Sequence, residues 1–254
     1  MGDFWTVRVK RGELTTKQLV TLIVLITSFI IILFLLSQLN LGEASNREIC
    51  HNSVVLRDKT ESLAGTLDCR TEYVCVSGGG DCEGLASAVS LGVELNQDSE
   101  KIKNETMNAI ADQMVSCWWM FGEGKVNYAS RSASDEVSCS VCSIVEFDSE
   151  MRKIESISYG ELYDYLRTAK KSESQTYLQY LYGTNTLENF EERVGVDGYL
   201  GDAIDFDEQY FVLTGISSGV AYTRYFEGHV PVVFMEKTKE NYDKIECDLF
   251  LTKS

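Results

Sequence analysis

Positive charge and histidine are both scarce in this chain. Lysines and arginines number 23 against 39 aspartates and glutamates, which gives a formal net charge of −16. Such an excess of carboxylates repels the phosphates of nucleic acids, so we expect no nucleic acid partner. The only two histidines, His51 and His229, are too few for a histidine-based metal centre. We therefore expect no metal and no cofactor.

Charge of either sign is missing from one long stretch near the amino terminus, from Gln18 to Gly42. A helix of that length extends about 37 Å, whereas the hydrocarbon core of a bilayer is about 30 Å thick. Basic residues precede the stretch, and short basic segments stay on the cytoplasmic side. They are Arg8, Lys10, Arg11 and Lys17. We therefore expect a single-pass protein of the cell membrane, with residues 19–41 in the lipid bilayer, the amino terminus cytoplasmic and the rest extracytoplasmic.

The residues just before the apolar stretch carry a family resemblance. Residues 10–14 read KRGEL, which resembles an archaeal prepilin-type (class III) signal of basic residues, a glycine and then an apolar helix. The resemblance implies cleavage after Gly12, a mature chain that begins at Glu13, and an apolar segment that packs in a filament. Lys17 departs from the bacterial type IV pilins, which carry a glutamate at that place. The alternative is an uncut anchor with basic flanks.

All eight cysteines follow the apolar stretch, on the predicted oxidising side. They are Cys50, Cys69, Cys75, Cys82, Cys117, Cys139, Cys142 and Cys247. An even number in that compartment favours disulfides over zinc, although the sequence does not select the pairing. Cys139 and Cys142 have the spacing of a redox pair, but a strand surrounds them. On a strand an odd offset of three places the two thiols on opposite faces.

Periodicity and capping signals predict a mixed α+β fold after this stretch. The predicted helices are 42–60, Asp98–Phe121, a segment that starts at the capping box Ser158-x-x-Glu161, and Tyr177–Tyr182; the predicted strands are Val137–Phe147, Tyr210–Ile216, Val220–Phe226, Val230–Lys237 and Ile245–Thr252. We divide the chain into a cytoplasmic basic segment (1–18), a transmembrane helix (19–41), a helical stalk (42–60) and an extracytoplasmic domain (61–254). The predicted fold class is an α+β ectodomain, braced by disulfides, on a single N-terminal transmembrane helix.

Two adjacent tryptophans, Trp118 and Trp119, end the helix predicted over Asp98–Phe121. Neighbouring helical residues point about 100° apart, so these two side chains cannot both face one core. Core packing is one interpretation of the pair. The other is a surface that meets a partner, such as another surface protein.

Three motifs invite a chemical interpretation, and each has a plainer one. Residues 215–219 (GISSG) match a nucleophile elbow around Ser217, but a strand follows where a helix is required, so a hairpin turn is expected. The glycines at 78–80 lack the lysine of a phosphate loop and predict a turn between bridged cysteines. The acidic residues of 197–208 lack calcium-loop spacing and predict a solvated loop. No catalytic residue is assigned.

These features together predict a non-enzymatic, membrane-anchored cell-surface protein with an acidic ectodomain. The resemblance adds a pilin-like subunit of a surface structure, which self-associates. The alternative is an exported enzyme with thiol redox or hydrolase chemistry. That alternative requires a cluster of nucleophile, base and acid that the motifs above do not supply.

Overall fold

A computed structural model of the chain describes residues 16–38, 41–60, 67–82, 89–128, 136–186, 202–217, 228–245 and 247–253. These residues belong to two compact units, one over Met1–Ser45 and the other over Asn46–Ser254. The predicted processing site at Gly12 and Glu13 lies outside the described residues, and so does the predicted strand Val220–Phe226.

The first unit contains helix α1 (Thr16–Gln38) and the start of helix α2 (Leu41–Thr60). Large apolar side chains follow one another along α1, and their exposed fractions lie between 46% at Leu19 and 61% at Leu25 and Phe29. The polar exceptions among residues 19–32 are Thr21, Thr27 and Ser28. The hydroxyl groups of Thr27 and Ser28 donate to helix carbonyls one turn earlier, so these two hydroxyls are satisfied within the helix.

The prediction of a transmembrane helix over residues 19–41 is corrected by the structure. None of the helices in the described part of the chain is both long enough and apolar enough to cross a membrane. The structure supports the other part of the predicted fold class, a mixed α+β fold with four disulfides.

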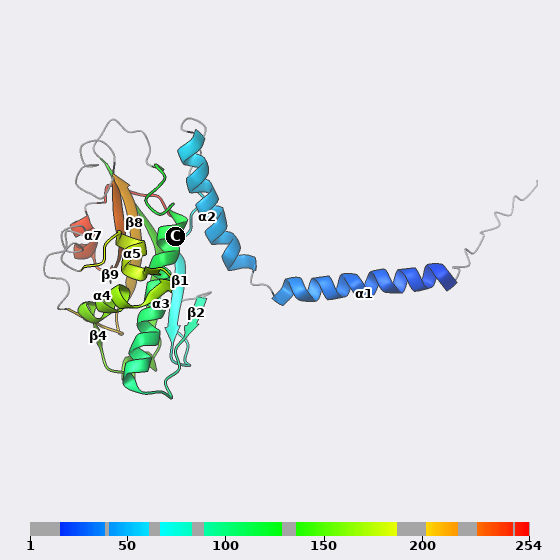
Figure 1. The fold of residues 1–254 in the computed structure, drawn as a ribbon, viewed down its shortest axis with the longest axis horizontal. Helices are drawn as coiled ribbons and strands as arrows, with labels where there is room; N and C mark the ends of the chain where they lie inside the picture. The colour runs from blue at the N-terminus through cyan, green and yellow to red at the C-terminus, as the bar shows by residue number, and fades with distance from the viewer. Residues whose placement is uncertain are drawn as a thin grey trace, which may run out of the picture. The chain divides into compact units, whose positions relative to one another are not determined.

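The second unit is built on a mixed sheet of six strands (Figure 1). Its strands are β1 (Glu72–Ser77), β2 (Val89–Gly92), β3 (Val137–Phe147), β8 (Tyr210–Ser217), β9 (His229–Glu236) and β10 (Leu249–Phe250). The order is β2-β1-β3-β8-β9, with β1 parallel to β2 and β3, and with β8 antiparallel to β3 and β9. The short β10 pairs in parallel with the first half of β3. All eleven residues of β3 are buried, as expected for the central strand of a covered sheet.

Three helices cover one face of this sheet: α3 (Ser99–Met120), α4 (Tyr159–Thr168) and α5 (Tyr177–Tyr182). The Asp98 side chain caps the start of α3, because it accepts a hydrogen bond from the Lys101 amide. The capping box predicted at the start of α4 is confirmed, since Ser158 and Glu161 bond reciprocally. Gly183 ends α5 in the left-handed conformation, at φ 65°.

The opposite face of the sheet packs against helix α7 (Lys239–Ile245) and the end of the chain. Alternation along β8 separates the two cores, because Val212 belongs to the larger cluster while Phe211 and Leu213 belong to the smaller one. Tyr242 of α7 stacks on Phe211 at 4.4 Å between ring centroids. Of the predicted strand Ile245–Thr252, the described residues form a strand at Leu249–Phe250, and Ile245 is the last residue of α7.

Minor elements complete the described part of the second unit. A 3₁₀ turn covers Met151–Lys153, β4 (Ile157–Ser158) pairs with β7 (Ala203–Ile204), and β5 (Lys170–Ser172) pairs with β6 (Gln175–Thr176). The carboxyl-terminal part of α2 packs through the buried Cys50 and Val54, which are four residues apart on one face.

Candidate functional site

All eight cysteines form disulfides, which confirms the predicted oxidised state. The pairs are Cys50–Cys69, Cys75–Cys82, Cys117–Cys142 and Cys139–Cys247. No cysteine is free, and every cysteine of the chain lies in the described part. Cys139 and Cys142 take different partners on opposite faces of β3, as the odd offset between them predicts. They do not form a redox pair with each other.

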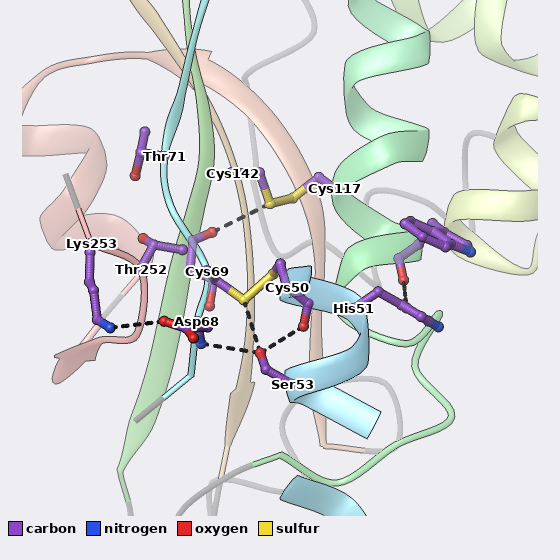
Figure 2. The surroundings of a disulfide bond; sticks show 12 residues. Cys50, His51, Ser53, Asp68, Cys69, Thr71, Cys117, Cys142, Thr252 and Lys253 are labelled. Carbon is purple, nitrogen blue, oxygen red and sulfur yellow. Dashed lines mark hydrogen bonds and ion pairs between the residues drawn. A yellow bond between two sulfur atoms is a disulfide. The ribbon is translucent and has the colours of Figure 1, made fainter. Parts of the chain in front are cut away.

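The Cys50–Cys69 bond ties α2 to the segment that leads into β1 (Figure 2). Next to the bond, the Ser53 hydroxyl donates to the Cys50 carbonyl at 2.8 Å and accepts from the Asp68 amide at 3.2 Å. Lys253, near the carboxyl terminus, bonds the Asp68 carboxylate at 3.3 Å. Three segments far apart in the sequence therefore meet at one disulfide. The contacts are structural and leave no reactive thiol.

The two tryptophans at the end of α3 separate as helix geometry requires. Trp118 is buried, and its ring meets His229 edge-on at 6.4 Å. Trp119 is half-buried and stacks on His51 of α2, with ring centroids 4.3 Å apart. The Trp119 carbonyl accepts a hydrogen bond from His51 Nδ1 at 2.7 Å. Trp119 therefore stacks on an aromatic side chain of its own chain. The binding of another protein at Trp118 and Trp119 stays a prediction.

Ser217 and His229 are neighbours in the β8–β9 hairpin, but both are engaged with backbone groups. The Ser217 hydroxyl donates to the Gly228 carbonyl at 3.1 Å. His229 Nε2 donates to the Val126 carbonyl at 2.9 Å. The serine is the last residue of β8, and the residues that follow it, 218–227, lie outside the described part of the chain. The geometry gives no support to nucleophilic catalysis by this serine.

The glycine turn at 78–80 is held between the bridged Cys75 and Cys82, as predicted. Its organising group is Asp148, which follows β3 and is fully buried. One carboxylate oxygen accepts from the Ser77 hydroxyl at 2.8 Å and from the Gly80 amide at 2.6 Å. The other accepts from the amides of Glu150 and Met151 at 3.0 and 2.8 Å. These donors come from the chain itself, so the turn is a structural feature and not a phosphate cradle.

The acidic residues predicted to form a solvated loop are partly described, with Asp197 outside the described residues. The Asp205 carboxylate accepts from the Asp207 amide at 2.9 Å, and Asp207 pairs with Arg152 at 3.2 Å. No group of three or more histidine, cysteine, aspartate or glutamate side chains in the described segments could hold a metal ion.

The described surface has a groove beside α3. Its volume is about 450 Å³. It lies between α3, strand β2 and helix α4, and is lined by Leu91, Gly92, Lys101, Asn104, Glu105, Asn108, Ala109, Asp112, Gln113 and Tyr165. Apolar side chains of β2 and α3 supply part of the wall, and polar side chains one helical turn apart on α3 supply the rest.

A hydrogen-bond network fixes the polar wall of this groove. Tyr177 of α5 donates to Asp112 Oδ1 at 2.8 Å, and Asn108 Nδ2 donates to Asp112 Oδ2 at 3.2 Å. The side-chain oxygen of Asn108 accepts from Tyr165 at 3.0 Å and lies 3.2 Å from the Tyr177 hydroxyl, whose single hydrogen is shared between Asn108 and Asp112. Burial, and then the neighbouring Asp112, raise the pKa of Tyr177 well above its usual range. The phenol therefore stays a donor at neutral pH, and the Asp112 carboxylate is held in one orientation.

Comparison with models of known protein families, with curated proteins and with solved structures finds no match. The assignment of function therefore depends on the chain's own geometry.

The sequence prediction did not identify this groove. Asn108 and Asp112 are four residues apart on a predicted helix, which is the one local signal that they share a face. Tyr165 and Tyr177 come from two other helices, and no spacing in the sequence indicates that they meet Asn108.

Proposed function

We propose that this chain is an exported, non-enzymatic surface protein that assembles with copies of itself through α1, in the manner of a pilin-like subunit. The observation that carries the proposal is the exposure of the apolar side chains along α1. A helix that is hydrophobic on all sides is normally buried. Each exposed square ångström of apolar surface costs about 25 cal/mol against burial, so α1 gains stability when other surfaces cover it.

The distribution of these side chains around α1 favours an assembly of many copies over a simple dimer. The consecutive residues Leu22, Ile23, Val24, Leu25 and Ile26 are 50–61% exposed. Steps of about 100° distribute five such residues around the whole circumference. A dimer interface covers one stripe of a helix, whereas this helix needs neighbours on several sides. A bundle of α1 helices, as in a filament, meets that requirement.

The disulfides and the net charge support export. Four disulfides in a chain of this size are typical of an oxidising compartment. The net charge of −16 keeps the disulfide-bonded unit dispersed while α1 associates.

Sedimentation of the full chain and of a charged α1 variant tests the proposal. We expect the native chain to form multimers, and the double variant Leu25→Lys, Phe29→Lys to need at least a tenfold higher concentration for assembly, because two buried ammonium groups oppose helix packing. Leu249→Lys, at an apolar side chain that is 44% exposed on β10, is the matched control and should assemble like the native chain. A monomeric native chain, or equal loss in the control, would contradict the proposal.

A further inference from the structure

The groove beside α3 carries a second inference that does not depend on assembly through α1. It lies wholly within the second unit, on α3, β2 and α4. Two features make it a candidate ligand site. It contains a carboxylate that is fixed by neutral neighbours, and Tyr165 gives it an aromatic side chain, which the concavity around Ile102 and Ile154 lacks.

The fixed carboxylate is Asp112. Its two oxygens accept from a phenol and an amide, and each carboxylate oxygen keeps a further lone pair for another donor. No basic side chain of the described segments forms an ion pair with Asp112. The side chain is nevertheless exposed. The groove thus presents an oriented negative charge that no lysine or arginine of the described chain neutralises.

The other charges of the groove nearly cancel. Lys101 and Glu105 both line it, and the Lys101 charge is one of the factors that lower the pKa of Glu105. Larger factors for Glu105 are hydrogen bonds from the Glu94 amide and the Gln97 side chain. Each oxygen of Glu105 accepts one hydrogen bond, as each oxygen of Asp112 does. The nearby Lys101 is what distinguishes Glu105, and it leaves Asp112 as the carboxylate of the groove that has no cation near it among the described ion pairs.

The walls of the groove suit a group with an alkyl stem and a cationic head. Leu91 and Ala109 offer apolar contact, and the half-buried Tyr165 offers an aromatic ring. The π face of a tyrosine attracts a cation within about 6 Å. Two carboxylates do not make a metal site, in keeping with the lack of a metal-holding cluster among the described residues.

We propose that this groove binds a protonated amine or guanidinium group, carried by a small amine or by a lysine or arginine side chain of a peptide, with Asp112 as its ion-pair partner. The cation of the ligand pairs with Asp112, which forms no ion pair with a described lysine or arginine. The network of Asn108, Tyr165 and Tyr177 holds the carboxylate in place before the ligand arrives, so less conformational entropy is lost on binding.

Titration of the full chain, followed by amide NMR shifts, tests the proposal and separates the two sources. The probes are 1,5-diaminopentane, the capped peptides acetyl-Gly-Lys-Gly-amide and acetyl-Gly-Arg-Gly-amide, and the neutral acetyl-Gly-Gln-Gly-amide. We expect shifts at residues 92, 108 and 112 with the cationic probes and none with the neutral peptide. A response to the diamine alone would identify a small amine as the ligand, and a response to the peptides would identify a basic side chain.

Three variants locate the site. Asp112→Asn keeps the shape of the side chain and should weaken binding at least fivefold. Asp164→Asn removes the same charge from an exposed carboxylate on α4 that pairs with Arg167, and should change binding less than twofold. A side chain at Gly92 meets open space, so Gly92→Trp should fill the groove and block the probes without unfolding the sheet. Binding by Asp112→Asn equal to that by Asp164→Asn, equal binding of the neutral peptide, or no shift with any probe would overturn the proposal.

Discussion

At the scale of single residues, Asp148 shows how one buried carboxylate can organise a turn. Burial acts to raise its pKa, but hydrogen bonds from Met151, Ser77, Gly78 and Gly80 outweigh burial and hold the pKa below the ordinary value of 3.8. A carboxylate with a depressed pKa in the folded state contributes stability above its unfolded pKa. That contribution is lost as the pH falls through the folded pKa.

We predict that Asp148→Asn lowers the free energy of unfolding by about 3 kcal/mol at pH 7, because an amide NH₂ would replace one acceptor oxygen and face a backbone donor. Urea unfolding between pH 3 and pH 7 measures the effect. The difference between the native chain and the variant should shrink below about pH 4, as the native carboxylate becomes protonated. Asp207→Asn, at an exposed ion pair with Arg152, is the control and should cost less than about 1 kcal/mol. A pH-independent difference would show that the charge of Asp148 is not the cause.

At the scale of elements, β3 connects the two cores. The register between β3 and β8 shifts between Val141 and Ser143, which marks a bulge. Cys139, before the bulge, bonds Cys247 on the face of α7, and Cys142 bonds Cys117 on the face of α3. The two disulfides therefore attach β3 covalently to the layers on both of its faces.

Loop length predicts the relative value of the disulfides. Cys139–Cys247 closes 108 residues and Cys75–Cys82 closes 7. In the chain-entropy model the longer loop stabilises by about 2 kcal/mol more. We predict that replacing Cys139 and Cys247 by alanine lowers the free energy of unfolding by about that much more than replacing Cys75 and Cys82.

The two pairs make a matched comparison, because each has one buried sulfur and one partly exposed sulfur. Urea unfolding of both double variants gives the measurement. Equal losses, or the reverse order, would mean that strain or residual structure in the unfolded state dominates.

Local sequence signals predicted many of these helices and strands, but no sequence signal predicted which distant segments meet. The strand Val137–Phe147 and the capping box at Ser158 are observed where the sequence predicts them, because strand propensity and side-chain caps act within a few residues. The cysteine pairing depends on which strands become neighbours, and the Asp112 network depends on how three helices pack. The spacing of these residues along the sequence predicts neither contact. The end of the chain shows the same limit, since Ile245 of the predicted strand belongs to α7 and β10 covers Leu249–Phe250.

At the scale of the whole molecule, the proposed assembly depends on how the chain begins. Processing after Gly12 would remove the basic Arg8, Lys10 and Arg11 from the end of the apolar helix. Helices without that cluster of like charge pack side by side at a lower electrostatic cost. Residues 1–15 lie outside the described part, so amino-terminal sequencing is the measurement that tests processing after Gly12.

We predict that amino-terminal sequencing of the mature protein, isolated from the cells that produce it, begins at Glu13. Gly12→Leu should retain residues 1–12 because the proposed peptidase acts after glycine. Gly2→Leu is the control and should be processed normally. A mature chain that begins at Met1 or Gly2 would rule out pilin-type processing, while sedimentation would still decide on self-assembly.

The position of Cys247 and β10 in the sequence determines when the Cys139–Cys247 disulfide can form during synthesis. The partner of Cys139 lies 108 residues further along, and ribosomes add about 5–20 residues per second. Cys139 therefore waits on the order of 5–20 s for Cys247 to be made, while the nearby Cys142 can already join Cys117. During that interval the first half of β3 lacks the neighbour that β10 provides, and the Cys139 thiol is open to a wrong partner. The synthesis of Cys247 and β10 thus ends the exposure of the central strand, so a chain truncated before Cys247 is expected to be defective in disulfide formation as well as in stability.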